Sequence, residues 1–208
     1  MGEQNFLNVE QIIPAQEAAE FMIGIADKSR DEVEGTPEEK NRHKVRREFW
    51  KALREALEGK TTRFDNVTPG PYGSFGAGSG VRGVWFNFGA NRAFGRAEIY
   101  IDRGEGEVNK FIYDQFNAQK DAIEAAYGGE LIWEPVVGER SCRIKEEKPG
   151  NIFVPEQWPE MIAFMADAMV RLENAFKGPL AAINSELHKR AKAEPVVAAE
   201  PALQAAAG

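Results

Sequence analysis

The stretch GRAEIYIDRGEGEVNKF (residues 95–111) decides the fold, because a strand pattern passes into a helix pattern within it. Apolar and polar residues alternate over residues 97–101, and successive side chains of a strand point to opposite faces of its sheet. An acidic, glycine-rich segment at residues 102–106 follows, and these residue types favour a turn. Apolar residues then recur at helical spacing from Val108 onward. The stretch therefore predicts a strand, a tight turn and a helix that begins near Glu107.

Working outward from this stretch, the same patterns recur on both sides of it. Helix patterns cover residues 37–58, 107–127 and 155–176, and strand patterns cover residues 81–88, 92–102, 130–136 and 140–146. A Gly-, Pro- and Ser-rich segment at 61–80 is predicted as a loop, and the last helix is expected to continue after a break at Gly178 and Pro179. We predict an α+β fold in which two hairpins form a four-stranded, mainly antiparallel sheet. Long helices pack on one face of it, in the order α-β-β-α-β-β-α.

The domain organisation follows from shifts in composition along the chain. Residues 1–36 read as a strand and a helix of linker-like character, and residues 37–188 as a single α+β domain. Thr36, Pro37 and Glu39 have the spacing of a capping box at the start of the domain. Residues 189–208 are rich in Ala, Pro and Glu and are predicted to be a disordered tail, because they offer little apolar bulk to bury.

Composition excludes some classes of function. The chain has 208 residues, 43% of them hydrophobic, which is enough to bury a core. A net charge of −7 argues against coating nucleic acid by bulk charge, although the basic segment KNRHKVRREFWK (40–51) leaves a local basic face open. A single cysteine, Cys142, excludes an intrachain disulfide. We expect a cytoplasmic protein with no membrane association, because no secretory signal or membrane-span pattern occurs.

No pattern predicts a catalytic centre, a metal or a cofactor. Carboxylates at 102, 105 and 107 could hold a metal ion, but a turn and a helix start use the same residue types, and we favour that interpretation. A PD-(D/E)XK nuclease requires a lysine two residues after its strand carboxylate, where this chain reads Glu98-Ile99-Tyr100. GAGSGVRG (76–83) lacks the Lys-Ser/Thr ending of a phosphate loop and precedes a strand. We therefore expect the protein not to be an enzyme.

A polar sheet face is the strongest candidate for a site. Alternation places Arg96, Glu98 and Tyr100 opposite Ile99, and it places Arg143 and Lys145 opposite Ile144. If both hairpins share one sheet, these polar residues lie together on its outer side, with Trp85 and Asn87 beside them. Arginine beside exposed aromatic rings suits single-stranded nucleic acid or a phosphate group. The simpler alternative, which we favour, is a solvated face held by cross-strand charge pairs.

Five long blocks of the sequence resemble a known bacterial family. They are REFWKALREAL (47–57), FDNVTPG (64–70), GAGSGVRGVWFNF (76–88), the block from Arg96 to Glu134, and WPEMIAFMADAMVRLENAFKGPL (158–180). In this order they resemble the domain of unknown function number 4268, over about residues 42 to 180. That family often follows a PD-(D/E)XK nuclease-like domain, so the resemblance implies work near DNA. The segment WEPVVGERSCRI (133–144) departs from the family pattern.

The resemblance implies three further candidate residues at family motif positions, Asn109, Lys120 and Arg140. The candidate nucleic-acid or ligand-binding residues are Arg96, Glu98, Tyr100, Asn109, Lys120, Arg140 and Arg143. We expect a non-catalytic accessory module that binds nucleic acid or a nuclease-type protein. Two alternatives stay open: an enzyme that uses Glu98 and Asp102 with Arg143 or Lys120, and a pure scaffold or homodimer.

Overall fold

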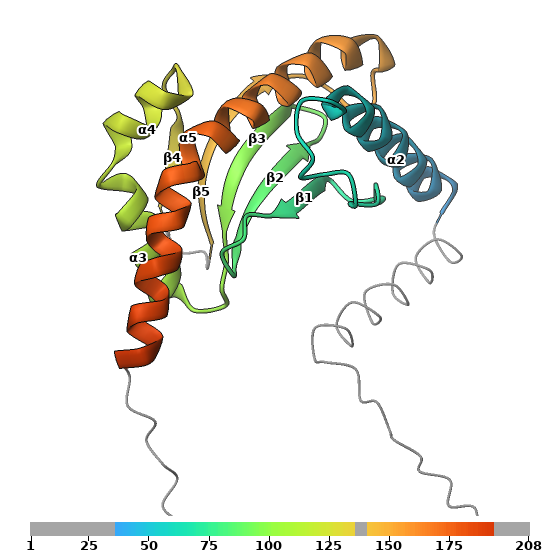
Figure 1. Cartoon of the computed structure of the whole chain (residues 1–208). Helices are drawn as coiled ribbons and strands as arrows, with labels where there is room; N and C mark the ends of the chain where they lie inside the picture. The colour runs from blue at the N-terminus through green and yellow to red at the C-terminus, as the bar shows by residue number, and fades with distance from the viewer. Residues whose placement is uncertain (1–35, 136–140, 194–208) are drawn as a thin grey trace, which may run out of the picture. The chain divides into compact units, whose positions relative to one another are not determined.

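The computed structural model describes residues 36–135 and 141–193 (Figure 1). The chain divides into two compact units, residues 1–43 and 44–208, and the sheet with its core belongs to the second unit. The strand and helix predicted before residue 36 lie outside the described residues, as does Arg140. At the start of the first described helix, the N–H of Glu39 donates to the Thr36 hydroxyl and the N–H of Thr36 donates to the Glu39 carboxylate, which confirms the predicted capping box.

The sheet has five antiparallel strands, one more than the sequence predicts. They are β1 (Ser74–Gly78), β2 (Val84–Ala90), β3 (Phe94–Ile101), β4 (Ile132–Glu134) and β5 (Cys142–Pro149), in the spatial order β1-β2-β3-β5-β4. The predicted α+β class and the two antiparallel pairs, β2 with β3 and β4 with β5, are confirmed. The prediction of a loop over residues 61–80 is wrong where β1 lies. Phe75 and Ala77 point into the core there, and the glycines at 76 and 78 disguise the alternation.

The helices also differ from the prediction in two places. They are α2 (Pro37–Leu57), α3 (Gly106–Asn117), α4 (Lys120–Tyr127) and α5 (Trp158–Ala193), with a short 3-10 turn at Pro155–Gln157 before α5. The helix predicted over residues 107–127 is two helices, separated at Ala118 and Gln119. The break predicted at Gly178 and Pro179 is wrong, because α5 continues through both residues. It ends at Ala193 and so includes residues 189–193 of the predicted tail.

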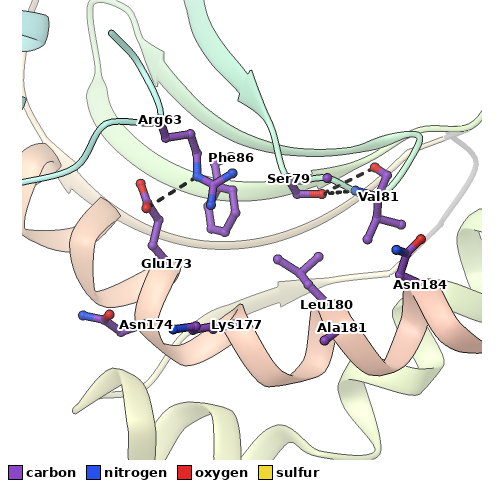
Figure 2. Close-up of a pocket in the computed structure, with 11 residues that line it drawn as sticks. Arg63, Ser79, Val81, Phe86, Glu173, Asn174, Lys177, Leu180, Ala181 and Asn184 are labelled. Carbon is purple, nitrogen blue, oxygen red and sulfur yellow. Dashed lines mark hydrogen bonds and ion pairs between the residues drawn. The ribbon is translucent and has the colours of Figure 1, made fainter.

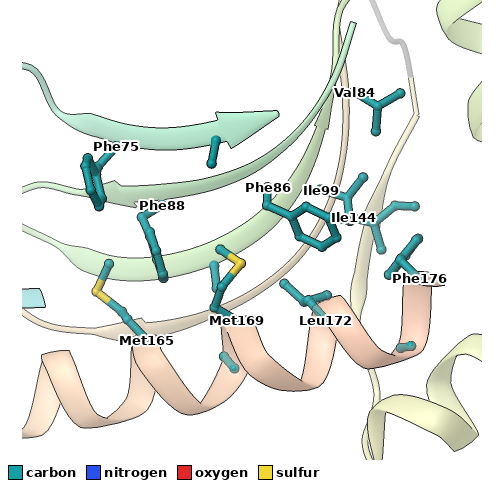
Figure 3. Packing of buried hydrophobic residues seen from close by; sticks show 14 of the residues in the cluster. Phe75, Val84, Phe86, Phe88, Ile99, Ile144, Met165, Met169, Leu172 and Phe176 are labelled. Atoms are coloured by element: carbon teal, nitrogen blue, oxygen red, sulfur yellow. The ribbon is translucent and has the colours of Figure 1, made fainter. Parts of the chain in front are cut away.

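The core lies between α5 and one face of the sheet, which we call the inner face (Figure 3). Figure 3 shows Met165, Met169 and Leu172 pointing from α5 toward Phe88 and Phe86. At the other end of the sheet, Trp50 of α2 stacks on Phe75 of β1 with ring centroids 5.8 Å apart. Further core positions, all fully buried, are Ala97, Ile99, Ile101, Ile144, Phe116 and Phe176. The inner face therefore receives the helices.

Candidate functional site

The opposite face of the sheet, which we call the outer face, carries the polar residues. Ten side chains define it: Trp85, Asn87, Arg96, Glu98, Tyr100, Ile132, Glu134, Arg143, Lys145 and Glu147. Directly opposed residues in antiparallel strands share a face, and Tyr100 is opposed to Arg143 as Glu98 is to Lys145. Ile99 and Ile144 are opposed to each other and fully buried on the inner face. The predicted division of the sheet into a polar and an apolar face is confirmed.

Glu98 lies at the centre of the outer face and is only 1% exposed. The side-chain amide of Asn87 donates to its Oε1 at 2.6 Å. Its Oε2 lies 3.0 Å from Nε of Arg96 and 3.6 Å from Nε of Arg143. Burial raises the pKa of Glu98 above its ordinary value, and Arg96, the Asn87 hydrogen bond and Arg143 oppose that rise. One carboxylate therefore orients two guanidinium groups from opposite sides.

A second ion cluster surrounds Lys145, which is also buried. Its Nζ lies 2.7 Å from Glu134 and 2.9 Å from Glu147. Burial alone would lower the pKa of Lys145, but the hydrogen bonds and the negative charges of Glu134 and Glu147 together raise it. With Arg96, Arg143 and Glu98, the outer face holds three cations and three carboxylates. Its charges are balanced.

Three flat side chains form a row across the middle strands, which we call the stacking row. Trp85, Tyr100 and Arg143 are neighbours through the register of β2, β3 and β5. The guanidinium carbon of Arg143 lies 5.1 Å from the centroid of the Tyr100 ring, within cation–π range. Trp85 remains 45% exposed, and Ile132, 45% exposed, lies on the same face over β4. Large apolar groups are therefore left in solvent on this face.

Glycines on β1 and β2 explain how the long polar side chains lie down on the sheet. A Cβ at Gly89 would lie 2.7 Å from Nε of Arg96, and a Cβ at Gly76 would lie 2.6 Å from Oδ1 of Asn87. Arg96 therefore lies across β2 and reaches Glu98 because Gly89 leaves room for it. The sequence analysis did not identify Gly76 and Gly89, because their role depends on which residues oppose them in the neighbouring strands.

Two predicted site residues, Asn109 and Lys120, do not join the outer face. Asn109 is buried on α3, where its side-chain oxygen accepts from the N–H of Arg103 at 2.8 Å and fixes the β3–α3 turn. Lys120 is on α4, with Nζ 5.8 Å from the centroid of the Trp133 ring, which belongs to the inner side of β4. Arg140 lies outside the described ranges. The residues that the structure brings together are Arg96, Glu98, Tyr100 and Arg143.

The acidic stretch after β3 forms a turn and a helix start, as the favoured interpretation has it. Oδ1 of Asp102 accepts from the N–H of Gly104 at 2.9 Å, and Gly104 has φ +90°, a conformation that favours glycine. Glu105 occupies the N-cap position of α3 and Glu107 lies in its first turn. Within residues 36–135 and 141–193, no three His, Cys, Asp or Glu residues are placed to hold a metal ion.

The basic segment of α2 is partly neutralised along its own helix. Lys44 lies 3.9 Å from Glu48, and Lys51 lies 4.0 Å from Glu55. Arg46 donates to the carbonyl of Pro71 at 3.3 Å. Such pairs leave less unbalanced positive charge than the sequence suggests, so the outer face is the better candidate.

Comparison with known proteins agrees with the resemblance seen in the sequence. None of the helices in the described ranges has the length and apolar character needed to cross a membrane. No curated protein and no solved structure matches the chain. The model of the family described as "Domain of unknown function (DUF4268)" matches residues 45–180, which is most of the chain. The chain therefore belongs to the DUF4268 family.

Proposed function

We propose that this protein is a non-catalytic binding module whose outer face binds single-stranded nucleic acid. The observation that carries the proposal is the stacking row of Trp85, Tyr100 and Arg143 on the face opposite the helices. Bases of a single strand stack on aromatic rings and on guanidinium planes without regard to sequence. The row crosses three adjacent strands, so neighbouring bases would meet neighbouring side chains.

The Glu98 cluster supports the same proposal through its geometry. Glu98 meets both Arg96 and Arg143 at Nε, so each guanidinium plane is oriented by a group that is itself buried. A side chain oriented before binding loses less conformational freedom on contact with a phosphate. The side chains of Arg96 and Arg143 keep 19% and 24% of their surface exposed, so a phosphodiester could reach them from solvent.

An enzyme at this face has no supporting observation. Glu98 is enclosed by Asn87, Arg96 and Arg143, and the Asp102 carboxylate is engaged in its turn. A general base must reach the proton that it removes. We therefore do not propose a reaction.

A protein partner is the second candidate, and the charge balance of the outer face favours it. The three cations each lie within 4 Å of a carboxylate of the same face, which weakens attraction to a polyanion. Trp, Tyr and Arg are also the residues that carry most binding energy at protein interfaces. Ile132, exposed on β4, would then be part of the contact.

The test is a fluorescence-anisotropy titration of a labelled oligothymidylate with the full chain. Because stacking contributes about 1–3 kcal/mol per base, Trp85→Ala should weaken binding at least fivefold. Two phosphate contacts should weaken binding about sevenfold between ~50 and ~200 mM salt. Tyr72→Ser is the matched control, since Tyr72 is another exposed aromatic residue (41%) outside the five strands.

Two results would count against nucleic acid. Absence of binding at low salt would exclude nucleic acid as the ligand and favour a protein partner. Equal losses in Trp85→Ala and Tyr72→Ser would mean that the outer face is not the contact surface. Comparison with Arg46→Gln separates the outer face from α2, because Arg46 belongs to the basic segment of that helix.

A further inference from the structure

A cleft on the helix side of the sheet lies apart from the outer face (Figure 2). It runs between α5 and the β1–β2 turn and has a volume of about 480 Å³. This volume falls within the roughly 300–1,000 Å³ of small-molecule sites. Figure 2 shows Glu173 pointing from α5 toward Arg63, and Leu180 and Asn184 on the side of the β1–β2 turn.

Arg63 is held rigidly at one end of the cleft. Its Nη1 donates to the carbonyl of Gly78 at 2.7 Å, and its guanidinium carbon lies 4.2 Å from the centroid of the Phe86 ring. Its Nε lies 3.5 Å from Glu173, whose two oxygens also accept from the Thr61 hydroxyl at 2.9 and 3.0 Å. The Glu173 charge is thus already compensated within the wall, while 27% of the Arg63 side chain stays exposed.

Lys177 supplies a second cation, and it is uncompensated. It follows Glu173 by one helical turn and lines the same cleft, yet it has no hydrogen-bond or ion-pair partner among the described residues. With Arg63, Lys177 and Glu173, the cleft carries one excess positive charge. The side-chain amides of Asn174 and Asn184 add neutral donors. An anion is therefore the ligand that this lining favours.

The remaining wall is apolar and leaves space. Val81 of the β1–β2 turn and Leu180 of α5 supply apolar side chains to the lining, and Ala181 adds only a methyl group. At Gly80 a Cβ would meet nothing within 4 Å, so the turn does not crowd the entrance. We propose that this cleft binds a small organic anion. Its oxyanion head, a carboxylate or a phosphate, lies between Arg63 and Lys177, and its apolar body lies against Val81 and Leu180.

The experiment is an NMR titration of the ¹⁵N-labelled full chain, following the backbone amides of Ser79 and Gly80. Phenyl phosphate and benzoate are the two anionic probes, and benzyl alcohol is the neutral control. Both anions should bind and benzyl alcohol should bind much more weakly. Binding of phenyl phosphate alone assigns the head group as phosphate, and binding of both probes assigns the cleft to oxyanions in general.

Variants test the assignment to this cleft. Lys177→Gln should weaken binding about two- to fivefold, the effect expected for one solvent-exposed charge. Lys189→Gln removes an equal charge from the same helix outside the cleft and should change nothing. Ala181→Leu should fill the cleft and abolish binding. The melting temperature of this variant, measured in parallel, shows that it is folded. The proposal is overturned if neither anion binds, if benzyl alcohol binds equally well, or if Lys177→Gln binds like the wild type.

Discussion

Replacing Gly89 by alanine tests whether the outer face is organised as described. The new Cβ would lie 2.7 Å from Nε, 3.2 Å from Cγ and 3.3 Å from Cζ of Arg96. The first of these distances is shorter than real Cβ contacts, so the Arg96 side chain must shift away from Gly89. It then loses its position 3.0 Å from Glu98. The substitution thus breaks an ion pair without touching either charged residue.

Two opposing contributions set the magnitude. Leaving a buried acceptor with fewer partners costs about 1–3 kcal/mol, and Glu98 is 1% exposed. Alanine is better than glycine in a strand by about 0.5–1 kcal/mol. We therefore expect Gly89→Ala to lower the free energy of unfolding by about 1–2 kcal/mol. The matched control is Gly78→Ala on the neighbouring strand, because a Cβ there meets nothing within 4 Å. It should raise that free energy by about 0.5–1 kcal/mol.

The assay is urea unfolding followed by tryptophan fluorescence, to which the fully buried Trp50 contributes. For a chain of this length Gly89→Ala should also lower the melting temperature by roughly 2–8 °C. The opposite signs of the two substitutions are the decisive feature, because a general effect of alanine would move both variants alike. If Gly89→Ala were as stable as Gly78→Ala, Arg96 would not lie across β2 and the geometry given for Glu98 would be wrong.

Three further predictions concern pH, the β1–β2 turn and the helix side. Because burial raises the pKa of Glu98, the folded chain holds that proton more tightly than the unfolded chain. The free energy of unfolding of the wild type relative to Glu98→Gln should therefore fall as pH rises from 4.5, the ordinary pKa, through the raised pKa of Glu98. Urea titrations at several pH values measure this difference, and a difference that rises with pH would contradict the prediction. Gly83→Ala should lower the free energy of unfolding in urea by about 2–4 kcal/mol, because φ is +74° at this residue and a Cβ would lie 2.9 Å from the Asp102 carbonyl oxygen. Gly80→Ala, with φ +90° and open space, should cost only about 1 kcal/mol, so equal costs would show that the Asp102 contact is absent. Tyr127→Phe should lower the free energy of unfolding by about 1–2 kcal/mol, because the Tyr127 hydroxyl donates to Glu146, which also accepts from Arg171 at 2.8 Å. Unchanged stability in thermal or urea unfolding would refute that role.

Alternation made the two faces of the sheet predictable from the sequence. In β3, and between Arg143 and Lys145 of β5, an apolar residue separates the polar ones, and only one assignment of faces buries Ile99 and Ile144. The helix start after β3 was predictable for a similar reason, because glycine and carboxylates mark a turn and an N-terminus. These features depend on residues close together in the sequence.

The features that the sequence did not reveal depend on contacts between distant segments. Three of the five residues of β1 are serine or glycine, at positions 74, 76 and 78, and these residue types predict a loop. Only the pairing with β2 identifies this segment as a strand. Pro179 lacks the N–H of a helix interior, yet Leu180 and Ile183 beyond it are buried, and their packing keeps α5 continuous. The cleft joins Arg63 to Lys177, which are far apart in the chain. No local pattern could have paired them.

The burial of Glu98 determines which contacts can dominate binding at the outer face. Among the described residues the partners of the Glu98 carboxylate are Arg96, Arg143 and Asn87, from β2, β3 and β5 rather than from a helix. A phosphate that draws Arg96 away must therefore leave a buried carboxylate with fewer partners, and that loss offsets part of the new attraction. Trp85 carries no such penalty, because its exposed ring makes no ion pair to break. Stacking on Trp85 should therefore contribute more to affinity than ion pairing with Arg96, which is why Trp85→Ala is the substitution on which the proposed function depends.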